Sequence, residues 1–259
     1  MPITHERKVH SMYYINPNKA KSSITAGMPF WTVYRDIANQ QNTLIAGTTG
    51  SGKSTALQGI IYTICDIYSP CDVELWIADP KRVDLIEWKD RGTPQLARYA
   101  NTADEIKRMI VDLVSVMETR FQYMEQHRQK KYDGKTIYLI VDELGDLVMN
   151  DRHITDSLKR ILQLGRAAGI RSILCTQSPS RYTLPAVLQV NFTARLALRC
   201  VSAIESRQVL NCAGAETLPE YGLGILLTPD NGMERREIPL QDPEDIEQMV
   251  RGYIRDTQY

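Results

Sequence analysis

The chain is 259 residues long, which favours one large domain or one domain with an extension. Hydrophobic residues make up 43% of it and charged residues 24%, the usage of a globular protein rather than a disordered one. Lysine and arginine number 31, as do aspartate and glutamate, so the zero net charge excludes a strongly basic nucleic-acid-binding domain. A nucleic acid held by a few local loops is still compatible with this balance.

Membrane and redox patterns favour a cytoplasmic chain. No apolar run approaches the roughly 18 residues of a membrane span, and the N-terminal region lacks the apolar core of a signal peptide. The five cysteines form no C-x-x-C pair, which argues against a disulfide scaffold or a zinc site and suits a reducing compartment. We therefore expect no membrane segment in this chain and a cytoplasmic location, and a membrane partner stays open.

Residues 1–40 read as polar and irregular, with three prolines. Within residues 1–30, four basic side chains accompany a single acidic one. We expect an N-terminal extension over 1–40, either a loosely packed arm or a contact surface, followed by the main domain over 41–259.

Regular alternation of strands and helices begins after residue 40. Short apolar runs predict strands at 43–47, 73–79, 137–142 and 171–176, and two shorter ones around Leu196 and Leu198 and around Ile225 and Leu226. Apolar residues at three- and four-residue steps predict helices at 54–66, 103–130, 152–168 and 242–257. Thr102 and Glu105 form a capping box at the start of the longest helix. This order predicts an α/β fold whose mostly parallel central sheet is flanked by helices.

Residues 47–54 match the phosphate-loop pattern G-x-x-x-x-G-K-[ST], between a predicted strand and a predicted helix. Glycines let backbone N–H groups turn inward around a phosphate, and the helix N-terminus adds the positive end of its dipole. Lys53 would reach the β- and γ-phosphates of ATP, and the Ser54 hydroxyl would ligate Mg²⁺. We expect the nucleotide to contact Gly47, Thr48, Thr49, Gly50, Ser51, Gly52, Lys53, Ser54 and Thr55.

Two carboxylates, Asp142 and Glu143, end the apolar strand whose apolar residues are 137–141. At the carboxyl edge of a parallel sheet they would lie beside the nucleotide. We expect Asp142 to hold Mg²⁺ and Glu143 to polarise the attacking water; alternatively, the pair caps the next turn.

Gln177 and Arg166 flank the strand at 171–176 on opposite sides. The Gln177 amide could sense the γ-phosphate or its water, or could be an ordinary turn residue. Arg166 could complement the dipole at a helix end or reach the nucleotide of a neighbouring subunit as an arginine finger.

The chain resembles the motor domain of the FtsK/SpoIIIE DNA translocases, within the wider FtsK–HerA group of ring ATPases. The matching stretches occur in the family's order over about residues 42–230, at 46–54, 79–81, 117–120, 141–143, 166–170, 176–180, 206–207 and 214–216. The resemblance implies a RecA-like P-loop ATPase that uses ATP and Mg²⁺ and translocates double-stranded DNA through a ring, expected to be a hexamer. It also implies that Arg166 is the arginine finger, that Gln177 is the polar sensor and that Arg207 lies near the subunit interface or DNA.

The chain departs from this family where DNA would be gripped. Relatives commonly carry cations at the positions of Ser178, Gln189 and Ala203, and all three are missing here. Arg181 and Arg207 are therefore the expected DNA-binding residues. Arg195 and Arg199 are further candidates, which strand alternation would put on one face, or they pair with acidic neighbours.

The family's membrane segment and its C-terminal winged-helix module are also not found in this sequence. This difference favours a role in plasmid, phage or integrative-element transfer. Two other functions stay open: a protein-export ATPase of the type VII kind, and a nucleotide-binding scaffold with little turnover.

Overall fold

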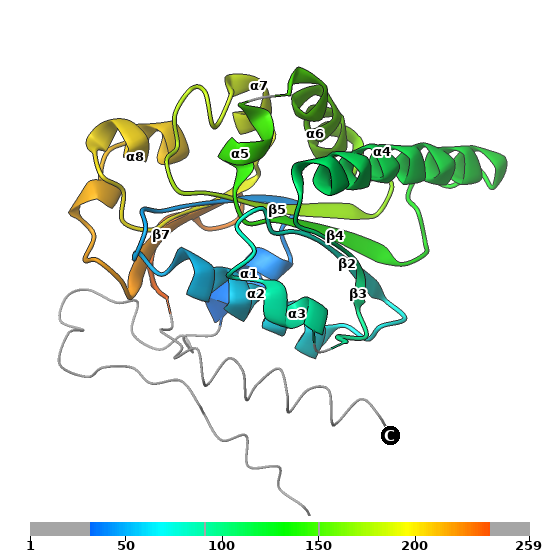
Figure 1. The fold of residues 1–259 in the computed structure, drawn as a ribbon, viewed down its shortest axis with the longest axis horizontal. Helices are drawn as coiled ribbons and strands as arrows, with labels where there is room; N and C mark the ends of the chain where they lie inside the picture. The colour runs from blue at the N-terminus through cyan, green and yellow to red at the C-terminus, as the bar shows by residue number, and fades with distance from the viewer. Residues whose placement is uncertain (1–31, 91, 150, 239–259) are drawn as a thin grey trace, which may run out of the picture.

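The computed structural model describes residues 32–90, 92–149 and 151–238. Within these residues the strands form one eight-stranded sheet in the order β3-β2-β4-β5-β1-β6-β7-β8 (Figure 1). The strands are β1 (Asn42–Ala46), β2 (Val73–Ala78), β3 (Leu96–Ala100), β4 (Thr136–Val141), β5 (Ile170–Thr176), β6 (Ala194–Ala197), β7 (Leu223–Thr228) and β8 (Gly232–Glu237). The first six in chain order pair in parallel, while β7 and β8 pair antiparallel at one edge. The predicted α/β fold with a mostly parallel sheet is confirmed.

Alternation along the buried strands divides the core into two layers. In β1, Leu44 packs on one face of the sheet and Ile45 on the other, because successive side chains of a strand point to opposite faces. Figure 1 shows the two sets of covering helices. One face is covered by α1 (Thr32–Ala38), α2 (Lys53–Ile67) and α3 (Ile86–Asp90), and the other by α4 (Ala103–Gln126), α5 (Leu144–Val148), α6 (Arg152–Leu164), α7 (Ala186–Gln189) and α8 (Ala203–Leu210).

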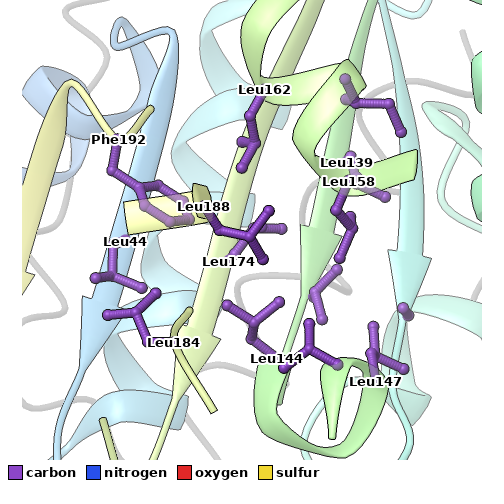
Figure 2. Packing of buried hydrophobic residues seen from close by; sticks show 14 of the residues in the cluster. Leu44, Leu139, Leu144, Leu147, Leu158, Leu162, Leu174, Leu184, Leu188 and Phe192 are labelled. Atoms are coloured by element: carbon purple, nitrogen blue, oxygen red, sulfur yellow. The ribbon is translucent and has the colours of Figure 1, made fainter. Parts of the chain in front are cut away.

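Leucines make most of the contacts on the second face. Figure 2 shows Leu158 and Leu162 of α6 and Leu188 of α7 directed at Leu139 and Leu174 of the sheet. All five side chains are at most 4% exposed. Burying each one stabilises the fold by about 1.5–3 kcal/mol, so these two helices are fixed relative to the strand ends that they connect.

The helix α1 corrects the expectation that residues 1–40 are irregular throughout. Its apolar residues Val33, Tyr34 and Ile37 are buried against α2. The contact depends on Gly59, since a Cβ there would lie 2.4 Å from the Tyr34 ring. The stretch was missed because seven residues show too little periodicity, and its burial comes from packing rather than from its own pattern.

Two predicted helices end earlier than expected. The long one ends at Gln126 rather than 130, because Arg128 adopts φ 54, the left-handed region that stops a helix. The next ends at Leu164 rather than 168: Ile170 N–H donates to the Gly165 carbonyl and closes a turn into β5. The capping box of Thr102 and Glu105 is present as predicted. The helix expected at 242–257 lies outside the described residues.

The fold also contains elements that the sequence did not predict, namely α3, α5, α7, α8, β3 and β8. Most are only four to six residues long, and α8 has eight residues with a weakly one-sided apolar pattern. Among the described residues, no helix is long and apolar enough to cross a membrane.

Candidate functional site

The carboxyl ends of β4, β5 and β1 lie side by side, and this arrangement forms the site. Val141 pairs with Leu174, and Ala46 pairs with Thr176, so the residues that follow these strands emerge at one edge. The loop after β1, Asp142 and Glu143 after β4, and Gln177 after β5 are therefore neighbours. Insertion of β5 between β1 and β4 is what brings Gln177 between the loop and the carboxylates.

The loop at residues 47–52 has the backbone that a phosphate cradle needs. Gly50 and Gly52 have φ values of 81° and 88°, which favour glycine. At Gly47 a Cβ would lie 2.5 Å from Ser51 Oγ, so a side chain there would displace the loop. The Thr48 N–H donates to the carbonyl of Arg199, which ties the loop to the segment after β6. Buried Ser51 Oγ has no hydrogen-bond partner in the described part of the chain.

Lys53 begins α2 and its ammonium is buried beside Asp142. The Lys53 Nζ donates to Asp142 Oδ1 at 2.6 Å and to the Asp142 carbonyl at 3.0 Å. Burial is the largest influence on the pKa of Lys53 and lowers it, but Cys175, Asp142 and Glu143 raise it by more, so the pKa lies above the usual lysine value. Lys53 is therefore a cation at neutral pH and lies directly after the phosphate loop, at the first residue of α2.

The second oxygen of Asp142 suits a metal ion or its water. Asp142 Oδ2 is buried without a hydrogen-bond partner among the described residues, and Lys81 Nζ lies 3.8 Å away. The Ser54 hydroxyl lies at the N-terminus of α2 and donates to Asp84 Oδ2 at 2.6 Å, which leaves its lone pairs for a cation. The described residues contain no cluster of three or more protein metal ligands. Two hard oxygens with nucleotide phosphates and water are a usual Mg²⁺ environment, so Ser54 and Asp142 fit that ion.

The Glu143 carboxylate accepts several hydrogen bonds at once. Its Oε2 lies 3.2 Å from Lys81 Nζ and accepts from the Gln177 N–H at 3.0 Å. Its Oε1 accepts from the Gly145 N–H at 3.3 Å, so the same side chain also caps α5. The Gln177 side chain points toward the loop, where its Oε1 accepts from the Thr49 hydroxyl at 3.5 Å. Both readings of Glu143, base and cap, are therefore compatible with its geometry.

Arg166 is not brought to this site. It is exposed in the turn between α6 and β5, at the amino end of that strand. The seven residues of β5 separate it from Gln177, a span of roughly 23 Å at about 3.3 Å per residue. Arg166 therefore lies at the opposite edge of the sheet from the phosphate loop of its own chain.

The sequence analysis assigned no role to three residues that contact the candidate site residues or the turn that carries Arg166. Lys81 pairs with Glu143, and Asp84 accepts from Ser54. Arg120 donates to the Ala168 carbonyl at 2.8 Å and so anchors the turn that carries Arg166. Lys81 and Arg120 lie in stretches matched to the family, a signal that could have found them; Asp84 has no such signal.

The expected DNA-binding residues Arg181 and Arg207 are both exposed. Arg181 lies in the loop after β5, stacked over the Tyr182 ring at 4.7 Å, and Arg207 lies on α8. The Gln189 amide donates to the Gln208 carbonyl at 2.5 Å, which joins α7 to α8. The loop after β5 and α8 therefore contribute to one side of the sheet.

The expectation that Arg195 and Arg199 share a strand face stays a prediction. The strand β6 ends at Ala197, so Arg199 lies beyond it. Arg195 is half-buried and donates to the carbonyls of Val209 and Gln189 at 2.9 and 3.0 Å. Burial lowers the pKa of Arg195. Its guanidinium connects α7 and α8 to β6 and is a structural cation.

The sequence of this chain is similar to that of a known protein family. The model of the FtsK/SpoIIIE family matches residues 3–138. A DNA translocase FtsK of Sporosarcina ureae is 34% identical over 264 residues, covering 92% of this chain and 34% of the relative. A second, from Chlamydia muridarum, is 30% identical and covers 78% of this chain and 28% of the relative. The chain thus spans about a third of the length of these curated relatives.

Solved structures share the fold at lower identity. The conjugation coupling protein TcpA of pCW3, determined with ATPgS, superposes with a TM-score of 0.71 at 20% identity, over 83% of this chain and 66% of that one. ATPases 2 and 3 of EssC from Geobacillus thermodenitrificans superpose with a TM-score of 0.74 at 18% identity, over 85% and 44%. At these identities the likeness concerns the fold alone.

Proposed function

We propose that this chain, which belongs to the FtsK/SpoIIIE family of P-loop ATPases, couples ATP hydrolysis to the movement of double-stranded DNA through a ring. The observation that carries the proposal is the meeting of Lys53, Asp142 and Glu143 beside a loop that needs glycine at residues 47, 50 and 52. That set contains the anion cradle, the cation and the carboxylates that phosphoryl transfer to water requires.

Binding of ATP requires Lys53 to exchange partners. Its ammonium is already charged and lies at the start of α2, where the helix dipole also favours an anion. Moving Nζ from Asp142 to the phosphates replaces one ion pair by another and leaves Asp142 free to ligate. The residues that would hold Mg²⁺ are Ser54 and Asp142, and the ion would supply charge neutralisation on the phosphate oxygens.

Hydrolysis requires a base, and Glu143 is our candidate. The Oε2 of Glu143 already accepts from Lys81 and from the Gln177 N–H, so in this arrangement it is not free to accept from a water. We propose that Glu143 takes the proton of the attacking water when a bound nucleotide draws Lys81 or the loop after β5 away. Gln177, whose backbone contacts Glu143 and whose amide contacts the phosphate loop, would couple the two events.

The position of Arg166 supports assembly into a ring. An arginine at the opposite edge of the sheet cannot complete its own site, but head-to-tail assembly would present it to the site of a neighbour. We propose a ring of identical subunits, a hexamer in the family pattern, in which Arg166 is the arginine finger. DNA would contact the loop after β5 and α8 through Arg181 and Arg207.

We further propose that the movement serves plasmid, phage or integrative-element transfer. The main rival is protein export of the type VII kind. The fold does not separate the two, because it is shared by the conjugation coupling protein TcpA and by the type VII secretion ATPase EccC of Thermomonospora curvata. A scaffold with little turnover is disfavoured by the intact set of Lys53, Asp142 and Glu143.

The test measures ATP turnover of the unchanged protein with and without long duplex DNA. The Glu143→Gln variant gives the baseline rate of an inactive enzyme. We expect duplex DNA to stimulate turnover of the unchanged protein and to leave the variant inactive. Turnover that is measurable but indifferent to DNA would favour the export ATPase, and turnover equal to the Glu143→Gln background would favour the scaffold.

A further inference from the structure

A short chain of hydrogen bonds behind the phosphate loop contains Asp84, a residue with no role so far. Its carboxylate Oδ2 accepts from the Ser54 hydroxyl at 2.6 Å. Its backbone carbonyl accepts from the Gln58 amide, and Gln58 Oε1 accepts from the buried Trp88 indole at 2.5 Å. Gln58 lies one helical turn after Ser54 on α2, so Asp84 is fixed at two points to the helix that carries the metal-binding hydroxyl.

The turn that carries Asp84 is also fixed from its other side. Fully buried Asp79 accepts from the N–H groups of Arg82 and Leu85, the residues that bracket this turn. The Tyr99 hydroxyl donates to the same carboxylate at 2.8 Å. The turn that carries Asp84 is therefore held from both sides by hydrogen bonds, and the half-buried Asp84 carboxylate is itself held by the Ser54 hydroxyl.

The hydrogen bond from Ser54 to Asp84 affects how the Ser54 hydroxyl can bind a metal ion. A serine hydroxyl has one hydrogen and two lone pairs, and only the lone pairs can bind a cation. If the hydrogen has no acceptor, it competes for the space that the cation needs. Asp84 accepts that hydrogen, and charged acceptors form the stronger hydrogen bonds.

We propose that Asp84 is a positioning residue for magnesium–nucleotide binding: its carboxylate takes the Ser54 hydroxyl hydrogen and turns the Ser54 lone pairs toward the metal. The inference rests on the proposed nucleotide site, not on DNA movement or ring formation. Residues that orient metal ligands in this way commonly change metal affinity or activity by about 10- to 100-fold when they are replaced.

The experiment measures the affinity for a fluorescent ATP analogue in Mg²⁺ and again in EDTA. The compared variants are Asp84→Ala, which removes the acceptor, Asp84→Asn, which keeps an acceptor oxygen of similar shape, and Asp90→Ala, which removes an exposed aspartate of the same segment. We expect Asp84→Ala to reduce the Mg²⁺-dependent gain in affinity about 10- to 100-fold. Asp84→Asn should recover much of that gain, and Asp90→Ala should match the unchanged protein.

The EDTA measurement separates positioning from a simple charge effect. Removing a negative charge near the phosphates should favour a metal-free anionic nucleotide, so affinity in EDTA should be unchanged or higher for Asp84→Ala. A loss of Mg²⁺-dependent affinity therefore has the opposite sign to the charge effect. An equal loss in Mg²⁺ and EDTA, or no loss in either, would overturn the inference.

A double-mutant cycle with Ser54→Ala gives a second readout. If Asp84 acts through the Ser54 hydroxyl, adding Asp84→Ala to Ser54→Ala should cause no further loss of Mg²⁺-dependent affinity. Additive losses would mean that Asp84 acts elsewhere. Thermal unfolding of each variant in EDTA checks that the proteins are folded. Failure of the unchanged protein to bind ATP would refute the proposed function, whereas normal Mg²⁺-dependent binding by Asp84→Ala would refute only this inference.

Discussion

The Nζ of Lys53 lies 2.6 Å from Oδ1 of Asp142, and the two side chains are only 3% and 0% exposed. The cation expected at the phosphates is thus paired with the carboxylate expected at the metal. We expect two consequences: each group stabilises the other, and ATP binding by Lys53 competes with their contact. Both consequences can be measured.

Lys53→Ala should abolish ATP binding and also destabilise the protein. The substitution leaves Asp142 buried without its cation, and breaking a buried pair in this way costs about 3–5 kcal/mol. Urea unfolding measures the loss, and Lys89→Ala, at an exposed lysine on α3, is the control. Adding Asp142→Asn should restore part of the stability but not the binding; a stable Lys53→Ala protein would mean that the pair contributes little.

The same pair predicts how stability depends on pH. Because the pKa of Lys53 is raised in the folded state, its contribution is fully present below the ordinary lysine value of about 10.4 and is lost as the pH rises through the higher folded value. The difference in free energy of unfolding between the unchanged protein and Lys53→Ala, measured with urea, should therefore stay constant from about pH 6 to about pH 9. A difference that disappears on going from the lower to the higher of these values would contradict the raised pKa.

Glu143→Gln should bind ATP with Mg²⁺ but turn it over at least about 10²-fold more slowly, as expected for loss of a general base. An amide oxygen at the Oε1 position can still accept from both the Gly145 and the Gln177 N–H groups, each 3.3 Å from Oε1, so the fold should be retained. Turnover and nucleotide affinity are measured together, with Glu125→Gln, at an exposed glutamate, as the control. Normal turnover in Glu143→Gln would leave the residue only its capping role.

Arg166→Ala and Glu143→Gln subunits should each be inactive alone and regain some activity when mixed. Arg166 lies at the opposite edge of the sheet from Glu143, so a mixed interface can combine an intact arginine with an intact base. Arginine fingers contribute up to about 10³–10⁵ in rate where they have been measured. Turnover is followed as the mixing ratio varies; an assembled Arg166→Ala ring with normal turnover would make this residue a helix-end cation only.

Arg181→Ala combined with Arg207→Ala should remove DNA stimulation of turnover and leave basal ATP binding intact. Both cations are exposed on the side formed by the loop after β5 and α8. A control that removes the same charge at the distant β3 edge is Lys89→Ala with Arg98→Ala. Stimulation that survives the first pair would place the DNA surface elsewhere.

The free subunit should bind duplex DNA weakly, without sequence preference and with a shallow salt dependence. Two phosphate contacts give a slope of only about −2 in log affinity against log salt, and a ring would multiply the contacts. Binding measured at several salt concentrations checks the slope. Steep, tight binding by a single subunit would require more cations than these two.

Local sequence was enough to predict the main strands, the three helices α2, α4 and α6, and the phosphate loop. A buried strand, a glycine-rich turn and a helix start are specified by adjacent residues, so Lys53 and Ser54 could be placed without a structure. Likewise, Asp142 and Glu143 follow an apolar run that ends at the sheet edge. Short elements such as α1 were not recognisable, since their apolar residues are buried by packing against distant segments such as Gly59.

Which side chains meet was decided only by the tertiary structure. Insertion of β5 between β1 and β4 makes Gln177 a neighbour of Glu143, and the turn after β2 brings Asp84 to Ser54 and Lys81 to Glu143. The same topology places Arg166 at the opposite edge of the sheet, away from the phosphate loop of its own chain. The physical reason is that strand order and register arise from the burial of both faces of the sheet. Burial depends on the whole set of elements, and the periodicity of one segment cannot specify its neighbours.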